Sequence, residues 1–256
     1  MIDPRAVIDP DAELAANVRI GPYTVIGPRV SIGEGTQIGP HVVIDGPTRI
    51  GRDNRIFQFA SLGAAPQDKK YAGEDTWLEI GDRNTIREFV TFNRGTVQDA
   101  GITRIGDDNW IMAYVHIAHD CQIGNQTIFA NNASLAGHVH IGDYAILGGF
   151  SLVHQFCHIG AHALTAFASG ISMDVPPYVT VGGSPAHAHG LNMEGLRRRG
   201  FPEDVRRLLK QAYKTVYREN RSLKDAITHL KTLDSASAEL EVLISFLENQ
   251  TRGIVR

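Results

Sequence analysis

Residues 20–56 read IGPYTVIGPRVSIGEGTQIGPHVVIDGPTRIGRDNRI, with an isoleucine at every sixth position. The same spacing of aliphatic residues or phenylalanine covers 8–62, 80–92 and 105–159, breaks at Thr165 and then returns. A small residue, usually glycine, often follows the repeated residue. An internal period of this kind is the sequence signature of a repeat architecture.

A period of six fits neither the 3.6-residue turn of a helix nor the simple alternation of an open sheet. It predicts a solenoid of short strands joined by tight turns, in which each hexad forms one side of a triangular coil. Three hexads make one coil, so residues eighteen apart stack at the strand spacing of roughly 4.8 Å. Glycine would supply the permissive backbone that a corner needs. An ordinary sandwich of short strands would not keep the sixfold spacing.

This pattern resembles that of the hexapeptide-repeat proteins, and the resemblance implies a left-handed parallel β-helix. The left hand departs from the usual right-handed rule for parallel strands and comes from the resemblance alone. We therefore predict an all-β left-handed parallel β-helix over residues 1–190, with polar loops at 63–78 and 93–103. A small α-helical domain is expected over 191–256.

The C-terminal part changes both its period and its charge. From Pro202 apolar residues follow the i, i+3, i+4, i+7 spacing of an amphipathic helix. Ser222 and Asp225 resemble a capping pair for a second helix, and a third is expected over about 236–249. Between 197 and 224 ten Lys or Arg accompany three acids, which predicts an acidic protein or phosphate partner, with part of this charge on a solvated face. The sequence pI of about 6.4 and the lack of a nucleic-acid motif argue against nucleic acid.

Composition indicates the cellular compartment in which the protein is found. The chain has 256 residues and a formal net charge of −3. It shows no apolar run near eighteen residues and no basic-then-apolar leader, so we expect a soluble, cytoplasmic protein without a transmembrane segment. Cys121 and Cys157 occupy equivalent repeat positions two coils apart, on the order of 9 to 10 Å, too far for a disulfide. Free thiols fit a reducing compartment.

Histidines are concentrated in one part of the repeat. Seven of the eleven lie within it: His116, His119, His138, His140, His154, His158 and His162. A lone solenoid histidine is most often a turn residue bonded to its neighbours, but this explanation is hard to extend to all seven. An adjacent carboxylate orients an imidazole and stabilises its cation, and Asp120 directly follows His119. Part of this cluster is therefore predicted to carry chemistry.

Four stretches resemble one enzyme family in particular. They are HIAHDCQIGNQTIFANNASLAGHV from residue 116, VHQFCHIGAHA from 153, DVPPYVTV from 174 and NMEGLRRRGF from 192. They are similar to the acyl-carrier-protein–UDP-N-acetylglucosamine O-acyltransferases of lipid A biosynthesis. The resemblance implies transfer of a 3-hydroxyacyl chain from acyl carrier protein to the sugar 3-hydroxyl. It also implies a homotrimer with active sites between subunits, no metal, and no cofactor beyond the phosphopantetheine of the carrier.

The resemblance assigns roles to individual residues. His119 aligns with the general base, Asp120 with its orienting partner, and the Gly137 N–H with the oxyanion donor, roles that suit their chemistry. Positions around the sugar and acyl chain are His116, His138, His154 and Gln155. Nucleotide-contacting positions are Asn192, Glu194, Arg198 and Arg199, while Asp68 and Lys70 in the first loop match residues that contact ligand from a neighbouring subunit. Gln67 is a further side chain of this loop whose chemistry would let it hold a polar ligand.

Two departures from the family pattern bear on specificity. Asn93 stands where the family commonly has histidine, which leaves a 3-amino analogue of the sugar open as the acceptor. Phe167 occupies the position of the acyl-length ruler, which is glycine in long-chain members. A phenyl ring there predicts a shorter donor, on the order of ten carbons and below fourteen.

Two rival functions share the solenoid. The γ-type carbonic anhydrases bind zinc through histidines at subunit boundaries, two of them about five apart in sequence, a spacing that no histidine pair here has. The N-acyltransferase acting later in lipid A synthesis carries an additional N-terminal domain, whereas the repeat here starts by residue 8.

Overall fold

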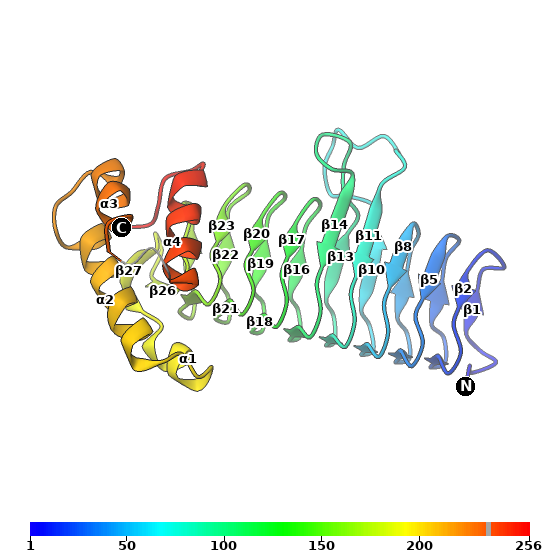
Figure 1. Cartoon of the computed structure of the whole chain (residues 1–256). Coiled ribbons are helices and arrows are strands. Elements are labelled where there is room, and N and C mark those ends of the chain that lie inside the picture. Colours follow the sequence, from blue (N-terminus) through cyan, green and yellow to red (C-terminus); the bar gives the residue numbers. More distant parts are fainter. Residues whose placement is uncertain (234–236) are drawn as a thin grey trace.

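The computed structural model of this chain describes residues 1–233 and 237–256. The chain forms a left-handed parallel β-helix with a helical domain at its C-terminal end (Figure 1). This confirms the fold expected from the sixfold spacing and the hexapeptide resemblance. Three flat sheets run the length of the coil and meet at three corners.

The strands of each sheet stack in the order of the coils. The first sheet contains β1 (Val7–Ile8), β4 (Val25–Ile26), β7 (Val43–Ile44), β10 (Ser61–Ala64), β13 (Thr91–Asn93), β16 (His116–Ile117), β19 (Ser134–Leu135), β22 (Leu152–Val153) and β25 (Gly170–Ile171). The second contains β2 (Glu13–Leu14), β5 (Val30–Ile32), β8 (Thr48–Ile50), β11 (Trp77–Ile80), β14 (Ile102–Ile105), β17 (Gln122–Ile123), β20 (His140–Ile141) and β23 (His158–Ile159). The third contains β3 (Arg19–Ile20), β6 (Gln37–Ile38), β9 (Arg55–Ile56), β12 (Thr85–Ile86), β15 (Trp110–Ile111), β18 (Ile128–Phe129), β21 (Ile146–Leu147), β24 (Leu164–Thr165), β26 (Val179–Gly182) and β27 (His187–Leu191).

The repeated aliphatic residues form the core. Ile26 pairs with Ile44, one coil further on, and both side chains are buried. Thr165 does not interrupt this stack, contrary to the sequence interpretation: it pairs with Leu147 and is fully buried. Its hydroxyl lies 2.7 Å from the Ser151 hydroxyl, so the polar atom is satisfied inside the core.

The corners are built differently from the sequence expectation. At most corners the residue three before the core residue adopts left-handed backbone geometry, and it is usually not glycine; Tyr23, for example, has φ 59°. The glycines that follow the core residue are instead required by close approach between coils. A Cβ on Gly33 would lie 2.6 Å from the carbonyl carbon of Gly51, so no side chain fits there.

We name the corners by the sheets they join: corner 1–2, corner 2–3 and corner 3–1. The two long loops, between β10 and β11 and between β13 and β14, both leave the coil at corner 1–2. They project together from one side of the solenoid (Figure 1). A single corner therefore collects both insertions.

The helical domain packs on the last coils. It consists of α1 (Met193–Arg198), α2 (Glu203–Tyr217), α3 (Leu223–Leu230) and α4 (Ala238–Asn249). The short α1 was not predicted, while Ser222 caps α3 as expected, its hydroxyl accepting from the Asp225 N–H at 3.1 Å. The predicted start of the third helix at 236 lies outside the described residues. Leu196, Leu209 and Leu240 form an apolar core with Tyr178 of the solenoid, which ties the domain to the coil.

Two further expectations concern the thiols and the membrane. Cys121 and Cys157 are buried free thiols, as predicted. Among the residues that the structure describes, no helix is long and apolar enough to cross a membrane.

Candidate active site

Corner 1–2 carries the predicted catalytic residues. His119 and Asp120 form the turn between β16 and β17, and Gly137 and His138 form the equivalent turn one coil further on. Asp120, His138 and Phe156 share one corner position in successive coils, with φ of 60°, 63° and 64°. The repeat itself therefore brings residues eighteen apart into one column.

His119 and Asp120 form a direct hydrogen-bonded pair. The His119 Nδ1 lies 2.8 Å from the Asp120 Oδ2. An ionised carboxylate only accepts hydrogen bonds, so the ring proton sits on Nδ1 and Nε2 keeps a free lone pair. This is the tautomer that a general base requires.

Asp120 is held ionised by its surroundings. Its side chain is 1% exposed, and it accepts the Thr96 N–H at 2.8 Å and the Thr96 hydroxyl at 2.6 Å. Burial alone would raise the pKa of Asp120, but the hydrogen bonds from His119 and Thr96 outweigh burial and place the pKa below its ordinary value. The Asp120 N–H in turn donates to the Thr103 hydroxyl at 2.8 Å. The carboxylate is therefore fixed in position as well as in charge.

Gly137 lies against the reactive edge of His119. A Cβ added at Gly137 would sit 2.5 Å from Cε1 and 2.8 Å from Nε2 of that ring. The backbone of Gly137 can approach the His119 ring this closely only because glycine has no side chain. Within the described residues its N–H has no hydrogen-bond partner, so a donor is free beside the basic nitrogen.

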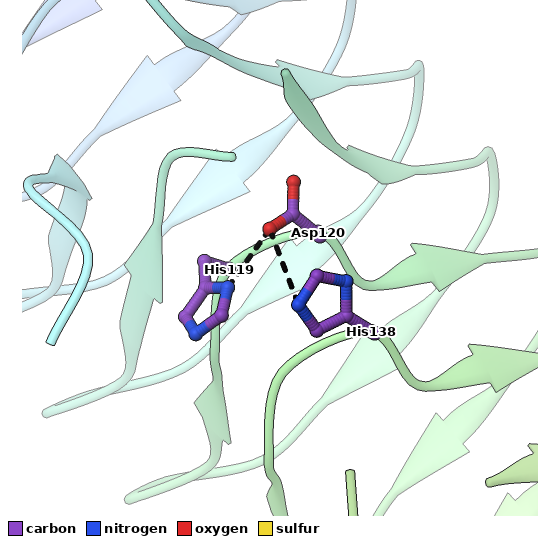
Figure 2. Close-up of side chains that lie close together, drawn as sticks. All are labelled: His119, Asp120 and His138. Atoms are coloured by element: carbon purple, nitrogen blue, oxygen red, sulfur yellow. Dashed lines mark hydrogen bonds and ion pairs between the residues drawn. The ribbon is translucent and has the colours of Figure 1, made fainter. Parts of the chain in front are cut away.

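His138 completes a cluster with this pair (Figure 2). Its ring meets that of His119 edge to face at 5.1 Å and stacks on Phe156 at 4.4 Å. Its Nε2 lies 3.8 Å from the Asp120 Oδ2, too far for a hydrogen bond. Its Nδ1 is 2.9 Å from the Asp99 Oδ2 in the second loop.

The same three side chains are the candidate metal ligands. One ligand atom each of His119, Asp120 and His138 lie within 4.8 Å of one another. The shared oxygen, Asp120 Oδ2, already accepts from His119 and from the Thr96 hydroxyl. A metal ion would have to displace both bonds, so this donor set fits an oriented base better than a zinc site.

His116 lies in β16 of the first sheet, the strand that precedes the turn with His119. Its Nδ1 is 2.7 Å from the Thr91 hydroxyl one coil earlier. Burial lowers the pKa of His116 below its ordinary value, and the nearby His119 adds to this. It is therefore held neutral near the base and does not compete for protons there.

Asn93 is buried at the root of the second loop. Its Nδ2 donates to the Ala65 carbonyl at 3.0 Å, which ties the two loops together. Its Oδ1 is buried and has no partner among the described residues. The neighbouring Arg94 donates to the carbonyls of Gly46 and Gly63 at 2.7 and 2.8 Å, so its guanidinium has a structural role.

The remaining loop and corner candidates are open to solvent. His154 and Gln155 are exposed at corner 1–2, with the His154 Nδ1 3.1 Å from the Gln155 carbonyl. Gln67 and Lys70 are exposed in the first loop, where the carboxylate of Asp68 accepts the Lys70 N–H at 3.0 Å. Within the described part of the chain, no hydrogen bond or ion pair joins these side chains to the His119 cluster.

The nucleotide candidates lie elsewhere. Asn192 caps α1 and donates to the His162 carbonyl at corner 2–3, at 3.1 Å. Glu194 pairs with Arg198 at 2.9 Å, while the Arg199 guanidinium lies over the Tyr144 ring at 4.9 Å. Tyr144 and His162 belong to corner 2–3, so one chain does not bring this set to His119.

Phe167 lies at corner 3–1, is 72% exposed and touches the edge of Phe150 at 5.7 Å. Three histidines of the sequence cluster also lie away from the base. His140 and His158 stack on the second sheet at 4.6 Å, and His162 stacks on Tyr144 at corner 2–3. These three have the ordinary stacking role of solenoid histidines.

Sequence reasoning missed Thr96, Thr103 and Asp99. All three belong to or border the second loop, and no spacing rule predicts where an irregular loop returns to the coil. The signal was indirect: an inserted loop next to a catalytic turn commonly supports it.

Comparisons with known proteins identify related families. The family model described as "Udp N-acetylglucosamine O-acyltransferase; Domain 2" matches residues 174–255, and that described as "Bacterial transferase hexapeptide (six repeats)" matches residues 102–137. A Thiobacillus denitrificans protein named acyl-acyl-carrier-protein–UDP-N-acetylglucosamine O-acyltransferase is 62% identical over 255 residues, covering 100% of this chain and 99% of the relative. A protein of the same name from Herminiimonas arsenicoxydans is 59% identical over 260 residues, with 100% and 99% coverage.

Two solved structures are also similar to this chain in fold and in sequence. The structure of LpxA from Acinetobacter baumannii superposes with a TM-score of 0.98 at 50% identity, covering 100% of this chain and 99% of that one. The UDP-N-acetylglucosamine acyltransferase of Francisella novicida gives a TM-score of 0.98 at 43% identity, covering 100% and 94%.

Proposed function

The chain belongs to the acyl-carrier-protein–UDP-N-acetylglucosamine O-acyltransferase family of lipid A biosynthesis, and we propose that it moves a 3-hydroxyacyl chain from acyl carrier protein to the 3-hydroxyl of UDP-N-acetylglucosamine. The observation that carries this proposal is the His119–Asp120 pair, at 2.8 Å, lying against Gly137. A base with a free Nε2 and a free backbone donor are what acyl transfer to a hydroxyl requires.

The reaction follows from these atoms. His119 Nε2 takes the proton of the sugar hydroxyl as that oxygen bonds to the thioester carbonyl carbon. The carbonyl oxygen becomes an oxyanion, which the Gly137 N–H stabilises. The intermediate collapses, the carbon–sulfur bond breaks, and the phosphopantetheine sulfur leaves with the proton that His119 received. No metal or cofactor of the enzyme takes part.

Asp120 supports both proton transfers. While His119 carries the extra proton, its ring is a cation, and the buried carboxylate at 2.8 Å stabilises that charge. Because Thr96 holds the carboxylate with two hydrogen bonds, this stabilisation needs no rearrangement. The lowered pKa of Asp120 keeps it ionised throughout.

We assign the donor a short chain, about ten carbons long. Phe167 aligns with the ruler position of the family, and its ring is 72% exposed at corner 3–1, where a neighbouring subunit's groove would end. A ring that fills the end of the groove excludes the last methylenes of a longer chain. Each excluded methylene corresponds to about 1–3 kcal/mol, so the preference should be steep.

Asn93 bears on which group of the sugar, a 3-hydroxyl or a 3-amino group, receives the acyl chain. Its buried, unpaired Oδ1 is an acceptor that a hydroxyl or an amino group of the sugar could satisfy. A 3-amino sugar offers more protons than a 3-hydroxyl one, so this oxygen keeps the 3-amino analogue as a second candidate acceptor.

A homotrimer accounts for the separated candidates. Within one chain they occupy three corners, with His119 at corner 1–2, Asn192 at corner 2–3 and Phe167 at corner 3–1. Three copies side by side would bring different corners together at each boundary. The basic stretch 197–224 would then receive the acidic carrier protein. The buried free thiols Cys121 and Cys157 support a cytoplasmic location.

The test is a panel of 3-hydroxyacyl carrier proteins of ten, twelve and fourteen carbons, assayed with the 3-hydroxyl and the 3-amino sugar nucleotide. We expect turnover to peak near ten carbons with UDP-N-acetylglucosamine, and Phe167→Gly to move the peak to longer chains. Equal rates with ten and fourteen carbons would contradict the ruler. Turnover with the 3-amino sugar alone would reassign the acceptor.

A further inference from the structure

The second loop contacts the catalytic cluster twice. Thr96 binds Asp120, and three residues later Asp99 binds His138 at 2.9 Å between Oδ2 and Nδ1. A compact turn joins the two, since both the Asp99 and the Gly101 N–H donate to the Thr96 carbonyl, at 3.3 and 3.1 Å. One loop therefore holds Asp120, the partner of His119, through Thr96, and itself supplies Asp99, the partner of His138.

The Asp99 carboxylate is itself oriented. Its Oδ1 accepts the Ala100 N–H at 2.8 Å, so Oδ2 is the oxygen that faces His138. An ionised carboxylate cannot donate, so the His138 proton must sit on Nδ1. The other nitrogen, Nε2, then points toward Asp120 and the catalytic turn (Figure 2).

We propose that Asp99 is a positioning residue for acyl transfer: it fixes the tautomer and direction of His138, so that Nε2 faces the site beside His119. This inference rests on the proposed function, because it assigns Asp99 a part in that reaction. Among the described residues, the other contacts of the His138 side chain are the rings of Phe156 at 4.4 Å and His119 at 5.1 Å and, beyond hydrogen-bond distance, the Asp120 Oδ2 at 3.8 Å. Stacking fixes the plane of an imidazole and leaves the choice between its nitrogens open, so the carboxylate makes that choice.

The contact between Asp99 and His138 contributes little to the stability of the fold. The Asp99 side chain is 45% exposed, and exposed pairs of this kind contribute little to stability. A variant at this position should therefore fold normally and reveal its effect in the reaction.

Asp99→Asn gives the sharpest test. The amide oxygen would still accept the Ala100 N–H, which leaves the NH2 group facing His138. That group donates, so the His138 proton must move to Nε2. We expect nitrogen-15 NMR of the ring to report this reversed tautomer, and kcat/KM to fall about ten- to a hundredfold with an unchanged melting temperature.

Two controls separate orientation from a general loss. Gln98→Ala changes the exposed neighbouring side chain and should keep wild-type kcat/KM. In a His138→Ala background, Asp99→Asn should have no further effect, because the residue that it orients is gone.

The proposal is overturned if Asp99→Asn keeps kcat/KM within twofold of wild type, or if its loss is the same in the His138→Ala background. A wild-type protein without turnover would instead remove the proposed function, and the His138 tautomer in Asp99→Asn would still show whether Asp99 orients the ring.

Discussion

At the level of single residues, the site is defined by how little space surrounds the His119 ring. Gly137 approaches its Cε1 so closely that a methyl group would stand 2.5 Å away. The proposed base and the proposed oxyanion donor are adjacent for this reason, and His119 cannot keep its position if Gly137 gains a side chain.

Gly137→Ala should therefore lower kcat by at least about a hundredfold, because the new methyl group displaces the base from its near-attack position. Gly149→Ala is the matched control: it occupies the same place after its core residue, but its Cβ would come no closer than 3.3 Å, to the Asn131 carbonyl. Steady-state kinetics of both variants check this. Similar activities in the two would show that the contact with His119 is irrelevant.

Residue roles were predictable only where a motif carries them. His119, Asp120 and Gly137 were expected from a resemblance of contiguous residues, and the structure brings them together. Thr96 and Asp99 act on the same cluster from an irregular loop, whose path follows from tertiary contacts rather than local spacing. The position of Arg94 depends on tertiary contacts in the same way, because its guanidinium donates to the backbone carbonyls of Gly46 and Gly63.

At the level of elements, the coil is supported by a buried polar ladder next to the third sheet. The Asn54 Oδ1 accepts the Asn84 N–H at 2.9 Å, and the Asn84 Oδ1 accepts the Asn109 N–H at 2.9 Å. Asn54, Asn84 and Asn109 are 0–1% exposed. Each side chain therefore satisfies the backbone of the next coil where that backbone turns a corner.

Asn84→Ala should destabilise the protein by about 1–3 kcal/mol, because it leaves the Asn109 N–H buried without a partner, while the Asn54 Oδ1 keeps only the backbone N–H of residue 84. Gln37→Ala, on the exposed face of the same sheet, should change stability by less than about 0.5 kcal/mol. Chemical denaturation measures both. A loss below 1 kcal/mol for Asn84→Ala would mean that water replaces the ladder.

The sixfold spacing predicts strands well because each core position is decided by one burial requirement repeated at every coil. It did not reveal what the glycines do, since close approach between coils depends on three-dimensional stacking. The break expected at Thr165 is absent because Ser151 supplies a hydroxyl partner that lies fourteen residues away in sequence. Helix α1 is too short for periodicity to detect.

At the level of the whole molecule, His162 joins the solenoid to the helical domain. Its ring stacks on Tyr144 at 4.7 Å and meets Phe201, from the segment between α1 and α2, at 5.0 Å. Burial, together with the nearby Arg199 cation, lowers the pKa of His162 to about 4. The interface therefore requires a neutral imidazole.

This linkage gives stability a defined pH dependence. Between pH 6.5 and about 4 the unfolded chain binds a proton at this histidine and the folded chain does not, so stability falls as the pH drops through that window, by about 1–2 kcal/mol once solvent screening of the half-buried ring is included. His162→Phe should remove this part of the slope. His41→Phe, a matched change in an exposed stack of Tyr23 and Phe59, should leave it in place. Identical pH profiles of unfolding free energy for wild type and His162→Phe would contradict the assignment.

The hand of the coil and the distribution of candidate residues over its corners could not be predicted from sequence patterns. Periodicity predicts a coil but does not determine its handedness, which was inferred from the resemblance to hexapeptide-repeat proteins. The spread of candidate residues over three corners is likewise invisible in a linear motif, because sequence order does not show which corner a residue occupies. It is this separation that favours an active site shared between copies.

The central claim is that His119 is the base of the acyl transfer. The most direct measurement is the single-turnover rate from a ten-carbon 3-hydroxyacyl carrier protein to UDP-N-acetylglucosamine for wild type, His119→Ala and, as a folded control, His140→Ala. We predict a loss of about 10²- to 10⁴-fold in His119→Ala alone, the contribution expected of general base catalysis. A His119→Ala enzyme that transfers acyl groups at the wild-type rate would contradict this mechanism.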